Sequence, residues 1–173
     1  MQSRTRGFSL LELAVVACVL SVLLAVLLNQ LTFYQEATER AQFESTLQAY
    51  KTALQIRLAE LILERREAEA RTLEVGNPTG LMPEKPANYG GDYPASPRPG
   101  TWYFDTGAQE LVYIVNTGDR LSLEGGNGPQ ATHGPKQLRF KVRVIYQPIG
   151  VPGGRVDGIG GITLQPGRVY RWQ

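Results

Sequence analysis

The sequence has 173 residues, of which 20% are charged and 42% hydrophobic, and its formal net charge is +2. These values are close to those of ordinary globular proteins, and so small a net charge gives no reason to expect a nucleic-acid partner. One cysteine, Cys18, and one histidine, His133, exclude an intramolecular disulfide and argue against a His/Cys metal site or a Cys–His nucleophile.

Residues 8–28 are almost entirely apolar. No charge occurs between Leu13 and Leu28, and Ser21 is the only polar side chain there. A helix over residues 8–28 would be about 31 Å long, which matches the hydrocarbon core of a bilayer. A soluble core helix would need a polar face, and a secretory signal peptide would have a shorter apolar region followed by small residues at its cleavage site. We therefore predict a transmembrane helix over residues 8–30.

Charges on the two sides of this run predict its orientation. Arg4 and Arg6 precede it, whereas Glu36 and Glu39 follow it before Arg40. Basic residues collect on the cytoplasmic side of membrane helices. We expect the N-terminus in the cytoplasm and the rest of the chain outside it.

Glu12 is an acid at the start of the apolar run, and two interpretations are open. In the first, Ser9 and Glu12 form an S-x-x-E capping box at the helix start. In the second, Glu12 needs a cation, because an acid inside a membrane normally has one. Cleavage between Gly7 and Phe8 would create an α-amino group that could pair with Glu12 of a neighbouring copy in a low-dielectric setting.

The residues around Glu12 resemble the class III signal of type IV pilins and type II secretion pseudopilins. A short basic leader precedes G-F-S-L-L-E-L and an apolar helix, and the glycine, phenylalanine, acid and spacing all agree. The resemblance implies a leader at residues 1–7, cleavage after Gly7 by prepilin peptidase, N-methylation of Phe8 and pairing of Glu12 with the Phe8 amine of a neighbouring subunit. One departure is Asn29, which stands where many pilins have a helix-kinking proline.

Residues 31–75 are predicted to form an amphipathic helix that continues into a globular domain. Neither glycine nor proline interrupts residues 8–75, and G-N-P ends the pattern at residues 76–78. Apolar residues recur every three or four positions and define one helical face: Phe43, Leu47, Tyr50, Leu54, Leu58 and Leu61.

The remaining sequence changes first to a loop and then to strands. Residues 76–100 are rich in proline and glycine and are expected to form a variable loop, which Tyr89 and Tyr93 pin onto the helix or the sheet. Residues 101–173 read as an antiparallel sheet region, with strands in TWYFDTGAQELVYIV, a third near residues 120–123, and one in QLRFKVRVIYQP. That last strand has Leu138, Phe140, Val142, Val144 and Tyr146 on one face and basic residues on the other. GVPGGRVDGIGGITL and GRVYRWQ are expected to form another loop and one or two closing strands.

No catalytic constellation is recognisable, and we expect no enzymatic activity and no resident cofactor. The acids Asp92, Asp105 and Asp119 are scattered at loops or strand ends, and Ser96 and Ser122 lack a nucleophile motif. Major pseudopilins resemble one another in having a C-terminal calcium loop. In this sequence only Asp157 stands in the late glycine-rich segment, and a single acid makes a poor calcium site.

The helix and strand patterns predict an α+β fold, and the resemblance implies a pilin-like one, with a long N-terminal helix packed on a small antiparallel sheet. The function implied is a structural subunit of a type IV pilus-like filament, in the first place a type II secretion pseudopilin. A minor pilin of an adhesion or DNA-uptake pilus is the alternative, and a membrane-anchored extracytoplasmic binding module is an alternative of another class. The implied partners are prepilin peptidase, other pilins or pseudopilins, and an inner-membrane assembly platform. The implied location is the inner membrane, with the C-terminal domain in the periplasm.

Overall fold

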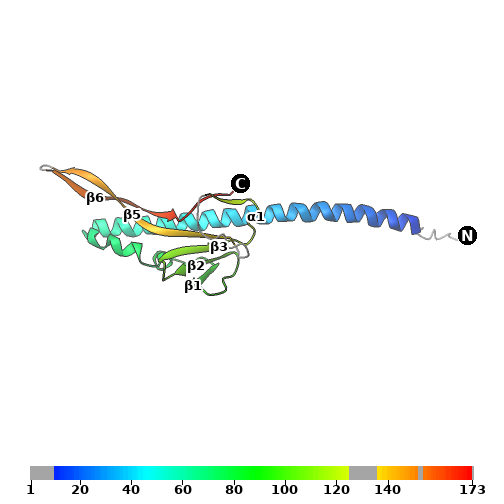
Figure 1. The fold of residues 1–173 in the computed structure, drawn as a ribbon, viewed down its shortest axis with the longest axis horizontal. Helices are drawn as coiled ribbons and strands as arrows, with labels where there is room; N and C mark the ends of the chain where they lie inside the picture. Colours follow the sequence, from blue (N-terminus) through cyan, green and yellow to red (C-terminus); the bar gives the residue numbers. More distant parts are fainter. Residues whose placement is uncertain (1–9, 125–135, 152–153, 173) are drawn as a thin grey trace, which may run out of the picture. The chain divides into compact units, whose positions relative to one another are not determined.

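The structure, a computed structural model, describes residues 10–124, 136–151 and 154–172 (Figure 1). The chain forms two units, Met1–Thr38 and Glu39–Gln173. One helix, α1 (Leu10–Leu63), provides the described part of the first unit and also the first element of the second. The second unit combines this helix with strands and is therefore α+β, as the sequence predicted.

Within the second unit, α1 buries the predicted apolar face. Its six members are between 0% and 6% exposed: Phe43, Leu47, Tyr50, Leu54, Leu58 and Leu61. They form one core cluster with inward side chains of the sheet, such as Trp102 and Phe140. Because the stripe recurs at helical spacing, this face could be predicted from the sequence alone.

The amphipathic helix ends at Leu63, so the predicted extension to residue 75 is wrong. Arg65 has a φ of 58°, and the amides of Arg65 and Arg66 bond back to the carbonyls of Ile62 and Leu61. This is a Schellman motif, which normally has glycine at the left-handed position, and here arginine occupies it. After the turn, the chain continues as a 3₁₀ helix, η1 (Glu67–Glu74).

Residues 76–100, predicted as a loop, contain two short elements. Helix η2 (Pro78–Leu81) begins with Asn77, whose side chain accepts a hydrogen bond from the amide of Thr79. Strand β1 (Tyr89–Asp92) follows. The two tyrosines hold this segment onto the rest of the unit, as predicted: Tyr89 packs against the main core cluster, and Tyr93 packs edge-on against Tyr103 of the sheet. Within the segment, the Tyr89 hydroxyl also accepts a bond from the Asn77 side-chain amide at 2.8 Å.

The main sheet has five strands in the order β1-β2-β3-β5-β6. The other strands of this sheet are β2 (Thr101–Asp105), β3 (Glu110–Ile114), β5 (Gln137–Val151) and β6 (Gly154–Pro166). The sheet is mixed and not antiparallel throughout as expected, because β1 runs parallel to β2. A separate two-stranded sheet pairs β4 (Leu121–Glu124) with β7 (Val169–Trp172).

Strand β5 confirms most of the predicted alternation. Leu138, Phe140, Val142 and Val144 are buried, but Tyr146 is 43% exposed. The pairing of β5 with β6 shifts register between Ile145 and Tyr146. The residue left without a partner is Gly160 of β6, so the period of β5 itself is not interrupted. Residues 145–148 are all exposed, so Tyr146 is exposed because this end of β5 lies beyond the core.

Strand β6 replaces most of the loop that was expected after residue 149. It pairs antiparallel with β5 from Val151↔Gly154 to Phe140↔Pro166, and the hairpin continues past the end of α1 (Figure 1). Its glycines weaken the strand signal in the sequence. At Gly160 a Cβ atom would come within 2.6 Å of the Gln147 side chain, so glycine leaves room for that side chain.

Candidate functional site

The most exposed apolar surface of the described chain is the first part of α1. Leu10–Leu28 has a mean hydropathy of 2.8, and none of it is buried in the structure. Soluble monomers rarely expose apolar patches of this extent. The helix is long and apolar enough to cross a membrane once, which makes it a candidate membrane anchor.

The structure places only one of the three predicted processing and assembly residues. Glu12 lies in the first described turn of α1, and its side chain is exposed among exposed leucines. Gly7 and Phe8 lie outside the described residues, as does Ser9, so the processing site and the capping box remain predictions.

The calcium candidate Asp157 lies on strand β6, opposite Pro148 of β5, and its side chain is outside the described part. No group of three or more potential metal-ligating side chains occurs within the described residues.

Sequence reasoning missed the role of Glu39, which is a buried carboxylate at the start of the second unit. Its Oε1 accepts hydrogen bonds from the Tyr113 hydroxyl at 2.9 Å and the Asn116 amide at 2.6 Å. Its Oε2 accepts bonds from the amide and the hydroxyl of Thr117, at 2.7 and 2.5 Å. Glu39 therefore joins α1 to the end of β3 and to the segment that follows it.

The contact also affects the titration of Tyr113. Burial raises the pKa of Tyr113, and the neighbouring Glu39 carboxylate raises it further, so this hydroxyl stays a hydrogen-bond donor.

The sequence did contain a signal for the role of Glu39, because Glu39 lies four residues before Phe43 and so falls on the buried helical face. An acid on that face indicates a buried polar contact rather than a solvated charge.

A second buried polar contact fixes the segment after η1. The Tyr50 hydroxyl on α1 and the Thr79 hydroxyl on η2 are 3.1 Å apart, and both residues are almost fully buried. Burial, as the main cause, raises the pKa of Tyr50 to about 12. Because one hydroxyl donates to the other inside the core, the contact ties η2 to α1.

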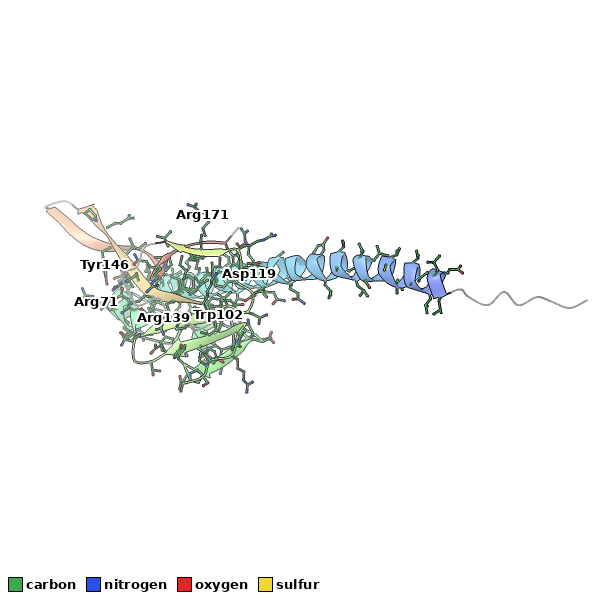
Figure 2. The ribbon with its side chains drawn as sticks, turned by 45° about the vertical axis from the view of Figure 1, so that its right-hand side comes forward. Arg71, Trp102, Asp119, Arg139, Tyr146 and Arg171 are labelled. Carbon is green, nitrogen blue, oxygen red and sulfur yellow. The ribbon has the colours of Figure 1, made fainter. Side chains whose placement is uncertain are left out.

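Arg139 on β5 lies on the face of the main sheet that points away from α1 and the core (Figure 2). One guanidinium nitrogen, Nη1, lies 2.9 Å from Asp105 and 3.2 Å from Glu110, and the guanidinium also covers the ring of Tyr93 at 5.2 Å. Backbone hydrogen bonds from the turn, first that of Ala108, and the Arg139 guanidinium lower the pKa of Asp105. This cluster holds the β2–β3 hairpin, β5 and the segment containing Tyr93 together.

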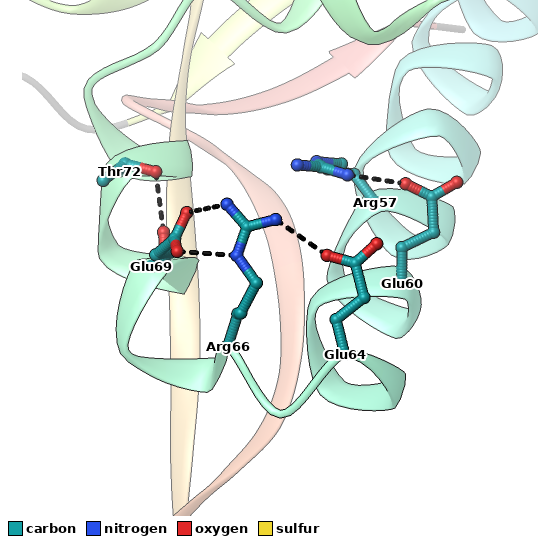
Figure 3. A network of polar contacts seen from close by, with 6 residues as sticks. All are labelled: Arg57, Glu60, Glu64, Arg66, Glu69 and Thr72. Carbon is teal, nitrogen blue, oxygen red and sulfur yellow. Dashed lines mark hydrogen bonds and ion pairs between the residues drawn. The ribbon is translucent and has the colours of Figure 1, made fainter.

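Arg66 makes a comparable set of ion pairs where α1 turns into η1, but in full contact with solvent. Its guanidinium bonds Glu64 at 2.8 Å and Glu69 through two bonds of 2.7 Å (Figure 3). These hydrogen bonds raise the pKa of Arg66 and lower the pKa of Glu69. Exposed pairs add little to stability, because water competes for the same groups.

The two arginines give a paired prediction. Arg139→Ala is expected to lower the free energy of unfolding by about 1 kcal/mol, because it removes partly buried ion pairs and an aromatic contact. Arg66→Ala is expected to leave the urea midpoint of the same protein unchanged. Tryptophan fluorescence during urea unfolding measures both, and equal midpoint shifts for the two variants would contradict the assignment.

Comparisons with known proteins leave the family open. No family model matches the chain, and no similar protein was found among curated proteins or solved structures.

Proposed function

We propose that this protein is a structural subunit of a type IV pilus-like filament, most closely a type II secretion pseudopilin. The observation that carries the proposal is the N-terminal pattern: a basic leader, Gly7, Phe8 and Glu12 in fixed spacing, and then an uncharged apolar helix. The exposure of that helix supports it, since Leu10–Leu28 buries nothing within the chain and requires a lipid or protein environment.

In the proposed mechanism, prepilin peptidase cleaves after Gly7 and methylates the new amine of Phe8. The subunit waits in the inner membrane with its N-terminus in the cytoplasm and its folded unit in the periplasm. An assembly platform then moves it into a helical filament. Apolar helices pack side by side there, and Glu12 pairs with the Phe8 amine of a neighbour. Because an unpaired charge is heavily penalised away from water, this pair favours the one axial offset between neighbouring helices that brings the two charges together.

The second unit is compatible with this role. A pilin-like subunit needs a helix that supplies both a membrane anchor and part of a domain core, and α1 carries both the apolar span and the core face around Phe43. Glu39 and Tyr50 add buried polar contacts between that helix and the rest of the unit.

Two alternatives remain, and only the second predicts a different N-terminus. A minor pilin of a type IV pilus would be processed in the same way, and the single cysteine favours the pseudopilin slightly, since many pilins have a C-terminal disulfide. A membrane-anchored binding module would keep its leader and would tolerate the loss of Glu12.

Replacing Glu12 with alanine tests the proposal. We expect normal removal of the leader. The fraction of the subunit found in sheared filaments should fall about tenfold or more, because every contact between neighbouring subunits loses the carboxylate that pairs with the Phe8 amine in a water-poor environment. Immunoblotting of sheared filaments and membranes measures that fraction. Ser21→Ala, a polar-to-apolar change in the same helix, is the control and should assemble normally. Wild-type incorporation of the Glu12→Ala subunit would contradict the proposal.

A further inference from the structure

Strand β6 forms one edge of the five-stranded sheet, and β5 is its only strand neighbour in the described chain. We call the side of β6 that faces away from β5 the outer edge. An edge strand presents unpaired N–H and C=O groups, which can pair with another extended chain.

The register shows which groups lie on the outer edge. The Val144 amide donates to Glu74 Oε1 at 2.9 Å and therefore points away from β6. In an antiparallel pair, a residue and its direct partner both point inward or both point outward. Ile162 is the partner of Val144, so its N–H and C=O point to the outer edge, and those of Leu164 do the same two residues later.

These backbone groups are held in place by a well-packed strand. The side chains of Ile162 and Leu164 are 6% and 3% exposed and belong to the main core. Two donors and two acceptors at two-residue spacing match the pattern that an added strand requires.

Between the register shift at Gly160 and Pro166, the outer edge lacks the features that normally block strand addition. Residues 161–165 read GITLQ, without a charge or a proline. Charged side chains, prolines, bulges and short length are the usual protection of sheet edges. The opposite edge has such protection, because β1 has four residues, an irregular register and a positive φ of 88° at Gly91.

The face beside this edge has positive charge that the chain does not compensate. Lys141 and Arg143 project from β5 opposite Gln165 and Thr163 of β6, and neither cation has an ion pair among the described residues. Arg139 on the same face does have two carboxylate partners. A Cβ atom added at Gly161 would meet nothing within 4 Å, so this face is open.

We propose that the outer edge of β6 binds an extended acidic polypeptide segment by strand addition. The backbone of that segment pairs with Ile162 and Leu164, and its acidic side chains lie beside Thr163 and Gln165, within reach of Arg143 and Lys141. Its intervening side chains lie over the rim of the core and are apolar. The partner is thus a segment in which acidic and apolar residues alternate.

The charge distribution of the chain favours an acidic partner over a second copy. Residues 136–173 carry a single acid, Asp157, and these basic residues: Lys136, Arg139, Lys141, Arg143, Arg155, Arg168 and Arg171. A second copy pairing through the same edge would bring like charges together, which is unfavourable. This inference does not depend on the filament proposal.

A peptide in which glutamate alternates with valine is the probe, and the full-length protein in detergent is the receptor. At peptide concentrations well above Kd, amide exchange at Ile162 and Leu164 should slow by about tenfold or more. The Thr163 and Gln165 amides already bond to β5 and should change little. A lysine–valine peptide is the control probe and should not bind.

Two matched pairs of variants separate strand addition from loss of folding. Thr163→Glu should weaken peptide binding by about tenfold or more because it gives Arg143 an internal partner and repels the acidic probe, whereas Thr163→Gln should not. Arg143→Glu should weaken binding, and Arg168→Glu, the same charge change on an exposed residue outside β6, should not.

Three results would overturn the inference. The first is no binding of the glutamate–valine peptide. The second is binding without slowed exchange at Ile162 and Leu164, which would indicate a charged surface only. The third is concentration-dependent protection of these amides without peptide, which would identify a second copy as the occupant.

Discussion

Replacing Glu39 with alanine is expected to destabilise the second unit by about 3 kcal/mol, because four donors lose a charged acceptor at once. The Tyr113 hydroxyl is buried and would have no replacement, whereas water can reach the Asn116 and Thr117 amides in part. The loss is therefore smaller than the sum of four separate bonds. Urea unfolding of the full-length protein in detergent, followed by tryptophan fluorescence, measures it.

Glu44→Ala is the matched control for this measurement. Glu44 is on the same helix and pairs with Arg40 at 2.9 Å, but both side chains are largely exposed. Its removal should change stability by less than about 0.5 kcal/mol. A loss for Glu39→Ala as small as that of the control would show that the carboxylate does not hold the segment after β3.

Phe43→Ala is expected to have the larger effect, about 4 kcal/mol, because a fully buried aromatic side chain leaves a cavity when it is truncated. Phe43 is 1% exposed, and its ring is stacked on Trp102 with centroids 5.4 Å apart. It also lies within 6.0 Å of four other aromatic rings: Tyr113, Phe140, Tyr170 and Trp172. Phe43 thus connects α1 with both sheets.

Near-UV circular dichroism should report the same change, since the Phe43–Trp102 stack contributes to the aromatic signal. Ile56→Ala is the control, because Ile56 is on the same helix but 56% exposed. It should retain both the spectrum and most of the stability. Equal losses for the two variants would mean that the aromatic cluster is not the centre of the core.

The parts of the fold that could be predicted are those with a regular pattern. The stripe from Phe43 to Leu61 has helical spacing, and the alternation from Leu138 to Val144 has strand spacing, and both faces are buried as expected. The apolar run at the N-terminus could be recognised by length and composition. In the stripe and in the alternating strand, local periodicity and burial agree, so no tertiary information was needed for them.

The parts that could not be predicted depend on tertiary contacts or on rare local conformations. The helix ends at Leu63, and Arg65 after it takes a left-handed conformation that favours glycine, so the sequence contained no stop signal at this point. Strand β6 is rich in glycine and is defined by its partner β5. The parallel pairing of β1 with β2 joins segments whose order cannot be derived from alternation.

The candidate sites also differ in whether the sequence alone could identify them. Glu12 could be identified from the sequence, because an acid in an apolar run is unusual wherever it occurs. Glu39 could have been identified from its helical phase, but its partners lie more than seventy residues away. The outer edge of β6 could not be identified, since it exists only once the strand order is known.

The central claim is that this chain is processed as a pilin-like filament subunit. Its most direct test is the intact mass of the protein from its native membrane, combined with sequencing of the N-terminal fragment. The proposal predicts a chain that begins at N-methylated Phe8, without the seven-residue leader MQSRTRG. A chain that still begins at Met1, in cells whose prepilin peptidase is active, would contradict it and would favour a membrane-anchored module.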